Sequence, residues 1–118
     1  MKVQVAVYQV YVPLENNLPC SLFRTSLKLI AEASGGYSVE RIQGGWVGND
    51  GQLIHEPVQV VTARVFVSGD VPWENRQRRL HDAMRGLVID QLTTGKQESV
   101  MADLGIGMRL YFKEDFYA

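Results

Sequence analysis

The stretch that decides the fold runs from Arg41 to Val67 and reads RIQGGWVGNDGQLIHEPVQVVTARVFV. Its central segment, Gly-Asn-Asp-Gly at 48–51, holds residue types that adopt a positive φ at low cost and therefore join antiparallel strands. The residues that follow, 58–67, are rich in β-branched side chains and alternate in the manner of a strand. We predict a hairpin with strands at 37–47 and 58–67.

Gly44-Gly45 lies inside the first strand of this hairpin. No helix start follows it, as a phosphate-binding loop would require, so we interpret the pair as a β-bulge or a close backbone approach. Trp46 follows directly and is predicted to cap one end of the core or a ligand pocket.

Two helices and three further strands surround the hairpin. Residues 19–34 and 72–92 repeat apolar side chains at helical spacing and end at Gly35-Gly36 and Thr93-Thr94-Gly95. The remaining strands are predicted at 2–12, 97–101 and 108–112.

This order of elements predicts an α+β fold for the single domain 1–118. It is the ferredoxin-like split βαβ arrangement (βαββαβ), in which two helices cover one face of an antiparallel sheet and the other face stays open.

Composition limits the function. The chain has 118 residues, a net charge of -1 and one cysteine, so no intrachain disulfide is expected and the charge argues against a general nucleic-acid binder. Gln4 and Gln9 break any apolar run near the N-terminus that could serve as a signal-peptide core or a membrane span, so neither is expected there. We expect a cytoplasmic protein that requires neither a metal nor a cofactor.

The order and spacing of several short motifs resemble a family of small bacterial domains of unknown function. Members of that family carry a GxW-type second strand, a hairpin with a DG turn and an EP dipeptide, and a strand that starts with QESV. The resemblance implies the ferredoxin-like fold and no catalytic set. Here the motifs are Gly44-Gly45-Trp46, Asp50-Gly51, Glu56-Pro57 and Gln97-Glu98-Ser99-Val100, and the match spans about residues 40–112.

Four residues are weak catalytic candidates. Cys20 lies in the predicted first turn of the first helix, where the helix dipole favours a thiolate. His55 and Glu56 could form an acid/base pair, although neighbouring strand residues face opposite sides of a sheet. Glu98 could ligate or orient something at a strand end, and we favour for it a structural hydrogen bond to Gly44-Gly45.

The second predicted helix carries four arginines between residues 76 and 85. Arg78 and Arg85, seven residues apart, share one helical face, and guanidinium groups suit phosphate or carboxylate recognition. The alternative is a solvated charged face.

Strand alternation is predicted to gather aromatic and arginine side chains on the open sheet face. With Trp46, the predicted ligand-binding residues are Tyr8, Arg64, Phe66, Arg109 and Tyr111. A patch of this kind suits burial against a second copy, with a small anionic or nucleotide-like ligand in the cleft between two facing sheets.

The leading hypothesis is therefore a non-catalytic homo-oligomeric module, a homodimer, that binds a small molecule or a protein partner; a phage or accessory-gene origin would fit it. One alternative is a small dimeric ferredoxin-like enzyme with acid/base residues. The other is a single-stranded RNA binder that stacks bases on the sheet face.

Overall fold

A computed structural model describes residues 2–14, 23–67 and 73–117. The predicted elements are present within these ranges with two changes of bounds: the strand predicted at 58–67 starts earlier, at Leu53, and the strand predicted at 97–101 lies at Val100–Asp103. The predicted start of the first helix, 19–22, lies outside the described residues. The elements are β1 (Val3–Pro13), α1 (Phe23–Ser34), β2 (Tyr37–Val47), β3 (Leu53–Val67), α2 (Trp73–Leu92), β4 (Val100–Asp103), β5 (Met108–Tyr111) and the 3-10 helix η1 (Lys113–Asp115).

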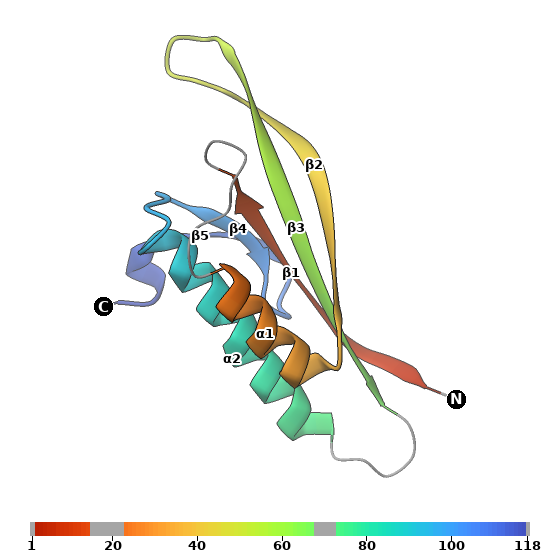
Figure 1. The fold of residues 1–118 in the computed structure, drawn as a ribbon. Coiled ribbons are helices and arrows are strands. Elements are labelled where there is room, and N and C mark those ends of the chain that lie inside the picture. The colour runs from red at the N-terminus through yellow and green to blue at the C-terminus, as the bar shows by residue number, and fades with distance from the viewer. Residues whose placement is uncertain (1, 15–22, 68–72, 118) are drawn as a thin grey trace.

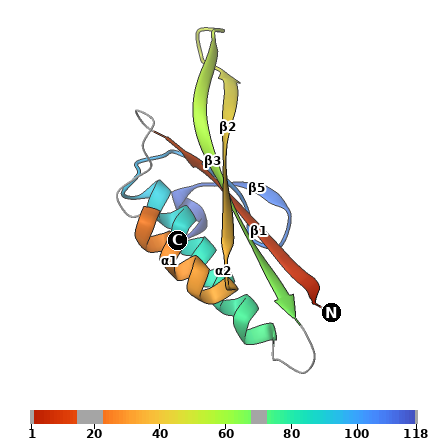
Figure 2. The ribbon, with the colours of Figure 1, turned by 45° about the vertical axis from the view of Figure 1, so that its right-hand side comes forward.

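The strands form one antiparallel sheet in the order β2-β3-β1-β4-β5. β1 and β3 lie in the interior of the sheet, as the sequence predicts, and β5 extends it beyond β4. Both helices pack on the same face (Figure 1). The view turned by 45° also shows the two helices together on one side of the strands (Figure 2). The predicted ferredoxin-like α+β fold is confirmed.

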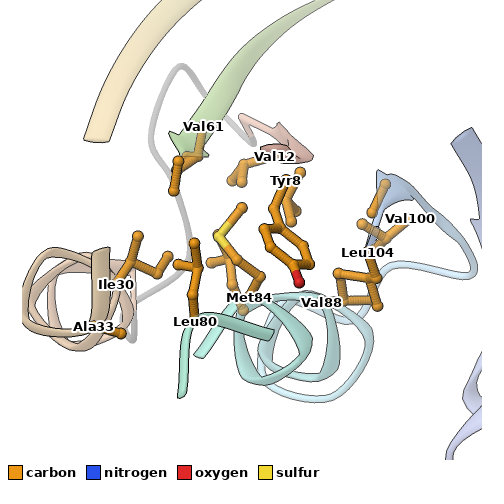
Figure 3. Packing of buried hydrophobic residues seen from close by; sticks show 14 of the residues in the cluster. Tyr8, Val12, Ile30, Ala33, Val61, Leu80, Met84, Val88, Val100 and Leu104 are labelled. Atoms are coloured by element: carbon orange, nitrogen blue, oxygen red, sulfur yellow. The ribbon is translucent and has the colours of Figure 1, made fainter. Parts of the chain in front are cut away.

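The core lies between the sheet and the two helices. β1 contributes Tyr8, Val10 and Val12, which are 2% exposed or less, and β3 and the helices supply the facing side chains. Figure 3 shows side chains of both helices, among them Ile30 of α1 and Leu80 and Met84 of α2, together on the side of the sheet from which Val61 and Tyr8 point. Burial of such side chains is the main favourable term in folding.

The helices are also joined by a polar contact. Ser26 Oγ of α1 donates a hydrogen bond of 2.6 Å to Asp90 Oδ2 of α2. Ser26 is buried, so this bond satisfies a hydroxyl that would otherwise lie unpaired between two helices. None of the helices in the described part of the chain is long and apolar enough to span a membrane.

A β-bulge interrupts β1. Gln4 pairs with Phe66 and Ala6 pairs with Val65, so Val5 is an extra residue on the β1 side. The extra residue reverses the alternation of side chains between the start of β1 and the rest of the strand. Gln4 therefore shares a face with Phe66, whereas Tyr8, four residues later, points to the opposite face.

The β2–β3 hairpin continues well past the rest of the sheet (Figure 1). The pairing of β1 with β3 ends at Pro13 and Val58, and the ladder partners of residues 44–56 in β2 and β3 are only one another. We call residues 44–56 the arm. Its turn is the predicted one: Gly51 has φ +80°, and its N–H donates to the carbonyl of Gly48.

Gly44 occupies the base of the arm without a bulge, since β2 and β3 pair without a register shift. A Cβ at Gly44 would lie 3.3 Å from both the Glu56 carbonyl oxygen and Val58 Cγ2. The predicted close approach is confirmed for Gly44, and the bulge of this sheet lies in β1 instead.

Candidate functional site

A hollow of about 400 Å³ lies at the end of the sheet where β1 and β2 begin and β3 ends. Its volume falls in the range of small-molecule sites. We call it the cationic hollow. The residues that line it include Lys2, Arg64 and Arg76, the aromatic residues Tyr37 and Phe66, and Gly35-Gly36.

Elements that are distant in the sequence bring these groups together. Arg64 and Phe66 lie on alternate residues of β3 and so point to the same side of the strand. Tyr37 starts β2 directly after the Gly35-Gly36 connection. Gly35 has φ +84°, and its N–H donates to the Ala31 carbonyl, which caps the C-terminus of α1. Arg76 comes from the start of α2.

The charge of the hollow is positive. None of the described residues that line it is Asp or Glu, and no described carboxylate forms an ion pair with Lys2, Arg64 or Arg76. Arg64 and Arg76 are exposed. Two guanidinium groups beside an ammonium group favour a carboxylate or phosphate. Phe66, which is 43% exposed, offers apolar surface on the side of Arg64. Tyr37 is 42% exposed, but it pairs with the core residue Ala63 and so points to the helix side of the sheet.

The structure corrects the placement of Tyr8. This side chain was predicted on the open face, but it pairs with Ala63, is 2% exposed and packs in the core beside α2. Figure 3 shows its ring among core side chains. The bulge at Val5 is the reason, because simple alternation from Gln4 would place Tyr8 on the open face.

Arg109 and Tyr111 were also predicted on the open face, and this placement is wrong as well. They pair with Ala102 and Val100, which are buried under the helices, and facing residues of an antiparallel ladder share a face. Tyr111 packs against the core.

The tail after β5 covers Tyr111 from the helix side. The ring of Tyr111 stacks on the ring of Phe116 at a centroid distance of 5.7 Å, and the Arg85 guanidinium lies 5.0 Å from the Phe116 centroid. The pKa of Tyr111 is raised overall, chiefly by burial of the phenol. The charge of Arg109 opposes this rise, and the charges of Asp103 and Asp115 add to it. Arg85 thus takes part in a packed aromatic cluster.

Of the predicted ligand-binding residues, only Arg64 and Phe66 meet in the hollow. Trp46 is 52% exposed on the arm, at the other end of β2. Arg78 is exposed and does not line the hollow. The arginine of α2 that lines it is Arg76.

The weak catalytic candidates are not brought together. His55 and Glu56 are neighbours on the arm and face opposite sides, while Glu98 precedes β4 and lines a separate hollow with Lys96 and Lys113. The predicted bond from Glu98 to Gly44-Gly45 is wrong, because β3 and β1 separate β2 from β4. Cys20 lies outside the described residues. Those residues contain no group of three His, Cys, Asp or Glu that could hold a metal.

The sequence interpretation missed Lys2, Tyr37 and Arg76. Lys2 directly precedes β1, Tyr37 starts β2 and Arg76 lies in the first turn of α2. A search for cations and rings near the ends of the predicted elements could have found them. The predicted RNA platform loses two of its rings, because Tyr8 and Tyr111 face the helices.

Comparisons with known proteins give the fold more context. No family model and no curated protein matches the chain, so the resemblance to a family of unknown function stays a prediction. Two solved structures are similar. One is a phage SAM lyase in complex with S-methyl-5'-thioadenosine (TM-score 0.54, 17% identity, 95% of this chain and 92% of that chain). The other is a phage SAM lyase in the apo state (TM-score 0.53, 19% identity, 98% of this chain and 94% of that chain). At this identity the likeness establishes the fold alone.

Proposed function

We propose that the chain binds a small molecule that carries a flat ring and an acidic group, and that the cationic hollow is its site. The observation that supports this most directly is the combination of Lys2, Arg64 and Arg76 with the exposed residue Phe66 in one hollow that no described carboxylate lines. The cations would hold the acid, and Phe66 would cover a face of the ring.

Adenosyl compounds are the ligand class we propose. The fold is shared over nearly the whole chain with a phage SAM lyase that holds S-methyl-5'-thioadenosine. S-adenosylmethionine combines an adenine ring with an amino-acid carboxylate, the two groups that the hollow suits. Its sulfonium carries a positive charge, which Lys2, Arg64 and Arg76 would repel unless it points away from them.

Three related ligands test this assignment by calorimetry. S-adenosylhomocysteine keeps the adenine and the carboxylate and lacks the sulfonium charge, so it should bind most tightly. S-adenosylmethionine should follow, and S-methyl-5'-thioadenosine, which lacks the carboxylate, should bind most weakly. Equal affinities for all three, or no binding, would contradict the role of the cations.

Variants locate the site. Arg64→Gln should lower the affinity for S-adenosylhomocysteine and leave the affinity for S-methyl-5'-thioadenosine nearly unchanged. Arg24→Gln, an exposed arginine of α1, removes the same charge away from the hollow and is the matched control. An equal loss in both variants would mean that only net charge matters.

Cleavage of S-adenosylmethionine is the second candidate function, and the two lyase structures favour it. Conversion to S-methyl-5'-thioadenosine breaks the bond between the sulfonium sulfur and Cγ of the aminobutyrate group, and the electron pair of this bond stays on sulfur. The carboxylate of the same substrate molecule forms the new bond to Cγ, so the aminobutyrate group leaves as a lactone and no further reactant is needed. Incubation with S-adenosylmethionine and chromatography for S-methyl-5'-thioadenosine tests it: binding without turnover supports a non-catalytic binder, and turnover that Arg64→Gln abolishes supports the enzyme.

A phage or accessory-gene origin and a cytoplasmic location belong to the same proposal. Both similar structures are phage proteins. A small protein that removes or cleaves an adenosyl compound would act where that compound is present, inside the infected cell.

A further inference from the structure

The arm exposes apolar side chains that its own fold does not use. Trp46, Val47 and Leu53 are 52%, 65% and 62% exposed. They lie on both sides of a two-stranded ribbon, and an isolated two-stranded ribbon is only marginally stable in water. Large apolar side chains gathered on such a projection are typical of an interaction surface.

The open face of the sheet has a second exposed apolar group. Gln9 lies on the face away from the helices, where its Nε2 donates to Thr62 Oγ1. Asp103 pairs with Gln9 and so shares this face. Met108 pairs with Asp103, and Met101, which alternates with Asp103 in β4, pairs with Leu110, so these three apolar side chains lie on the open face as well. Met101, Met108 and Leu110 are 40%, 43% and 55% exposed. Neither helix covers this face, since both lie on the other side (Figures 1 and 2). At its centre, Val60 and Thr62 of β3 are only 5% and 7% exposed, so neighbouring side chains of the chain itself already bury them.

The length of β3 relates the arm to the hollow. β3 runs from Leu53 to Val67, with Val60 at its midpoint. Ile54, which pairs with Trp46, lies six residues before Val60, and Phe66 lies six residues after it. By the same count Glu56 corresponds to Arg64. If a two-fold axis passes near Val60, each arm lies over the hollow of the other copy, about 20 Å from the axis.

The charges of the two regions are complementary. Residues 44–56 contain Asp50 and Glu56 and no lysine or arginine. The hollow contains Lys2, Arg64 and Arg76 and no described carboxylate. Glu56 and Ile54 lie on alternate residues of β3 with Arg64 and Phe66, so alternation directs all four side chains to the open face.

We propose that a second copy of this chain packs open face to open face, with the β3 strands antiparallel, so that the arm of each copy closes the cationic hollow of the other. Glu56 then faces the partner's Arg64, and the ring of Trp46 approaches the ring of the partner's Phe66. This inference goes beyond the proposed function, because the arm completes the site whatever ligand the site holds. Ligand pockets usually bury most of the ligand's surface, whereas the hollow of a single copy is open. The partner's arm would supply the missing cover.

A charge swap tests the arrangement by light scattering without any ligand. The wild type should have the mass of two copies at micromolar concentration. Glu56→Arg alone and Arg64→Glu alone should each shift toward the mass of one copy, because both contacts of each homodimer become repulsive. A mixture of the two variants should return to two copies, since a mixed dimer has two attractive contacts.

Controls separate this result from misfolding and from net charge. Arg24→Glu makes the same charge change as Arg64→Glu on the exposed side of α1 and should remain a dimer, and circular dichroism should be the same for all variants. A wild-type mass of one copy, or of three or more, would overturn the proposal. So would a mixture that fails to recover two copies while both variants are folded.

The two proposals can fail separately. Loss of adenosyl-ligand binding with an intact charge swap would remove the proposed function alone. Ligand binding by a wild-type monomer would remove the dimer alone.

Discussion

The two halves of the β2–β3 hairpin have the same secondary structure and different surroundings. In the inner half, β3 lies between β2 and β1, and Val61, Ala63 and Val65 are at most 1% exposed beneath the helices. In the outer half, which is the arm, each strand has only the other, and Trp46 and Leu53 are more than half exposed.

This difference shows that apolar content alone does not identify a core. The inner residues are apolar because two helices cover them. The outer residues have no such cover within the described chain, and we attribute their apolar character to the association proposed above. The following variants test that separation, from the largest expected effect on unfolding to the smallest.

The largest effect is expected in the inner layer. Leu87 of α2 is fully buried, and Leu87→Ala should lower the free energy of unfolding by about 2–5 kcal/mol because it leaves a cavity. Denaturant unfolding measures this. Leu29→Ala in α1, where the side chain is 52% exposed, is the control and should change little. Equal losses would mean that the two positions do not differ in packing.

The contact between the helices should come next. Ser26→Ala removes the hydrogen bond to Asp90 and should cost about 1.5–3 kcal/mol, the range for bonds to charged groups. Thr25→Ala, at the exposed neighbouring position, is the control. A loss at Ser26 no larger than at Thr25 would show that the bond adds nothing to helix packing.

The arm should contribute little to the stability of the single chain. Trp46→Ala is expected to change the free energy of unfolding of the monomer by less than about 0.5 kcal/mol, as an exposed substitution does. The same variant should weaken self-association in light scattering. A large loss of monomer stability would show that the arm packs on its own body.

Alkaline pH should give the smallest effect, at the helix side of β5. Burial raises the pKa of Tyr111 in the folded chain above its ordinary value of 10.0, so the folded state keeps the phenol proton more tightly than the unfolded state does. This contribution is complete below pH 10 and declines as the pH rises through the folded pKa.

Tyr111→Phe should therefore lessen the loss of stability above pH 10. Thermal unfolding across this pH range, with phenolate absorbance of both proteins, provides the measurement. The same alkaline decline in both proteins would mean that Tyr111 titrates alike in the folded and unfolded states.

Local signals in the sequence were sufficient for the element order. Gly-Asn-Asp-Gly at 48–51 predicted the hairpin, because residues that tolerate positive φ are needed in a tight turn. The apolar repeats and their glycine ends predicted α1 and α2. Together these elements are compatible with few arrangements, so the ferredoxin-like fold followed.

Tertiary structure decided which side chains form the site. The bulge at Val5 turns Tyr8 into the core, and no local signal marks that extra residue. Pairing with β4 turns Tyr111 toward the helices and leaves Met108 and Leu110 exposed, the reverse of what their polarity suggests. Side-chain direction in a strand alternates with period two, so one extra residue or one shift in register moves a whole set of residues to the other face. The sequence determined the strands, and only their pairing determined their faces.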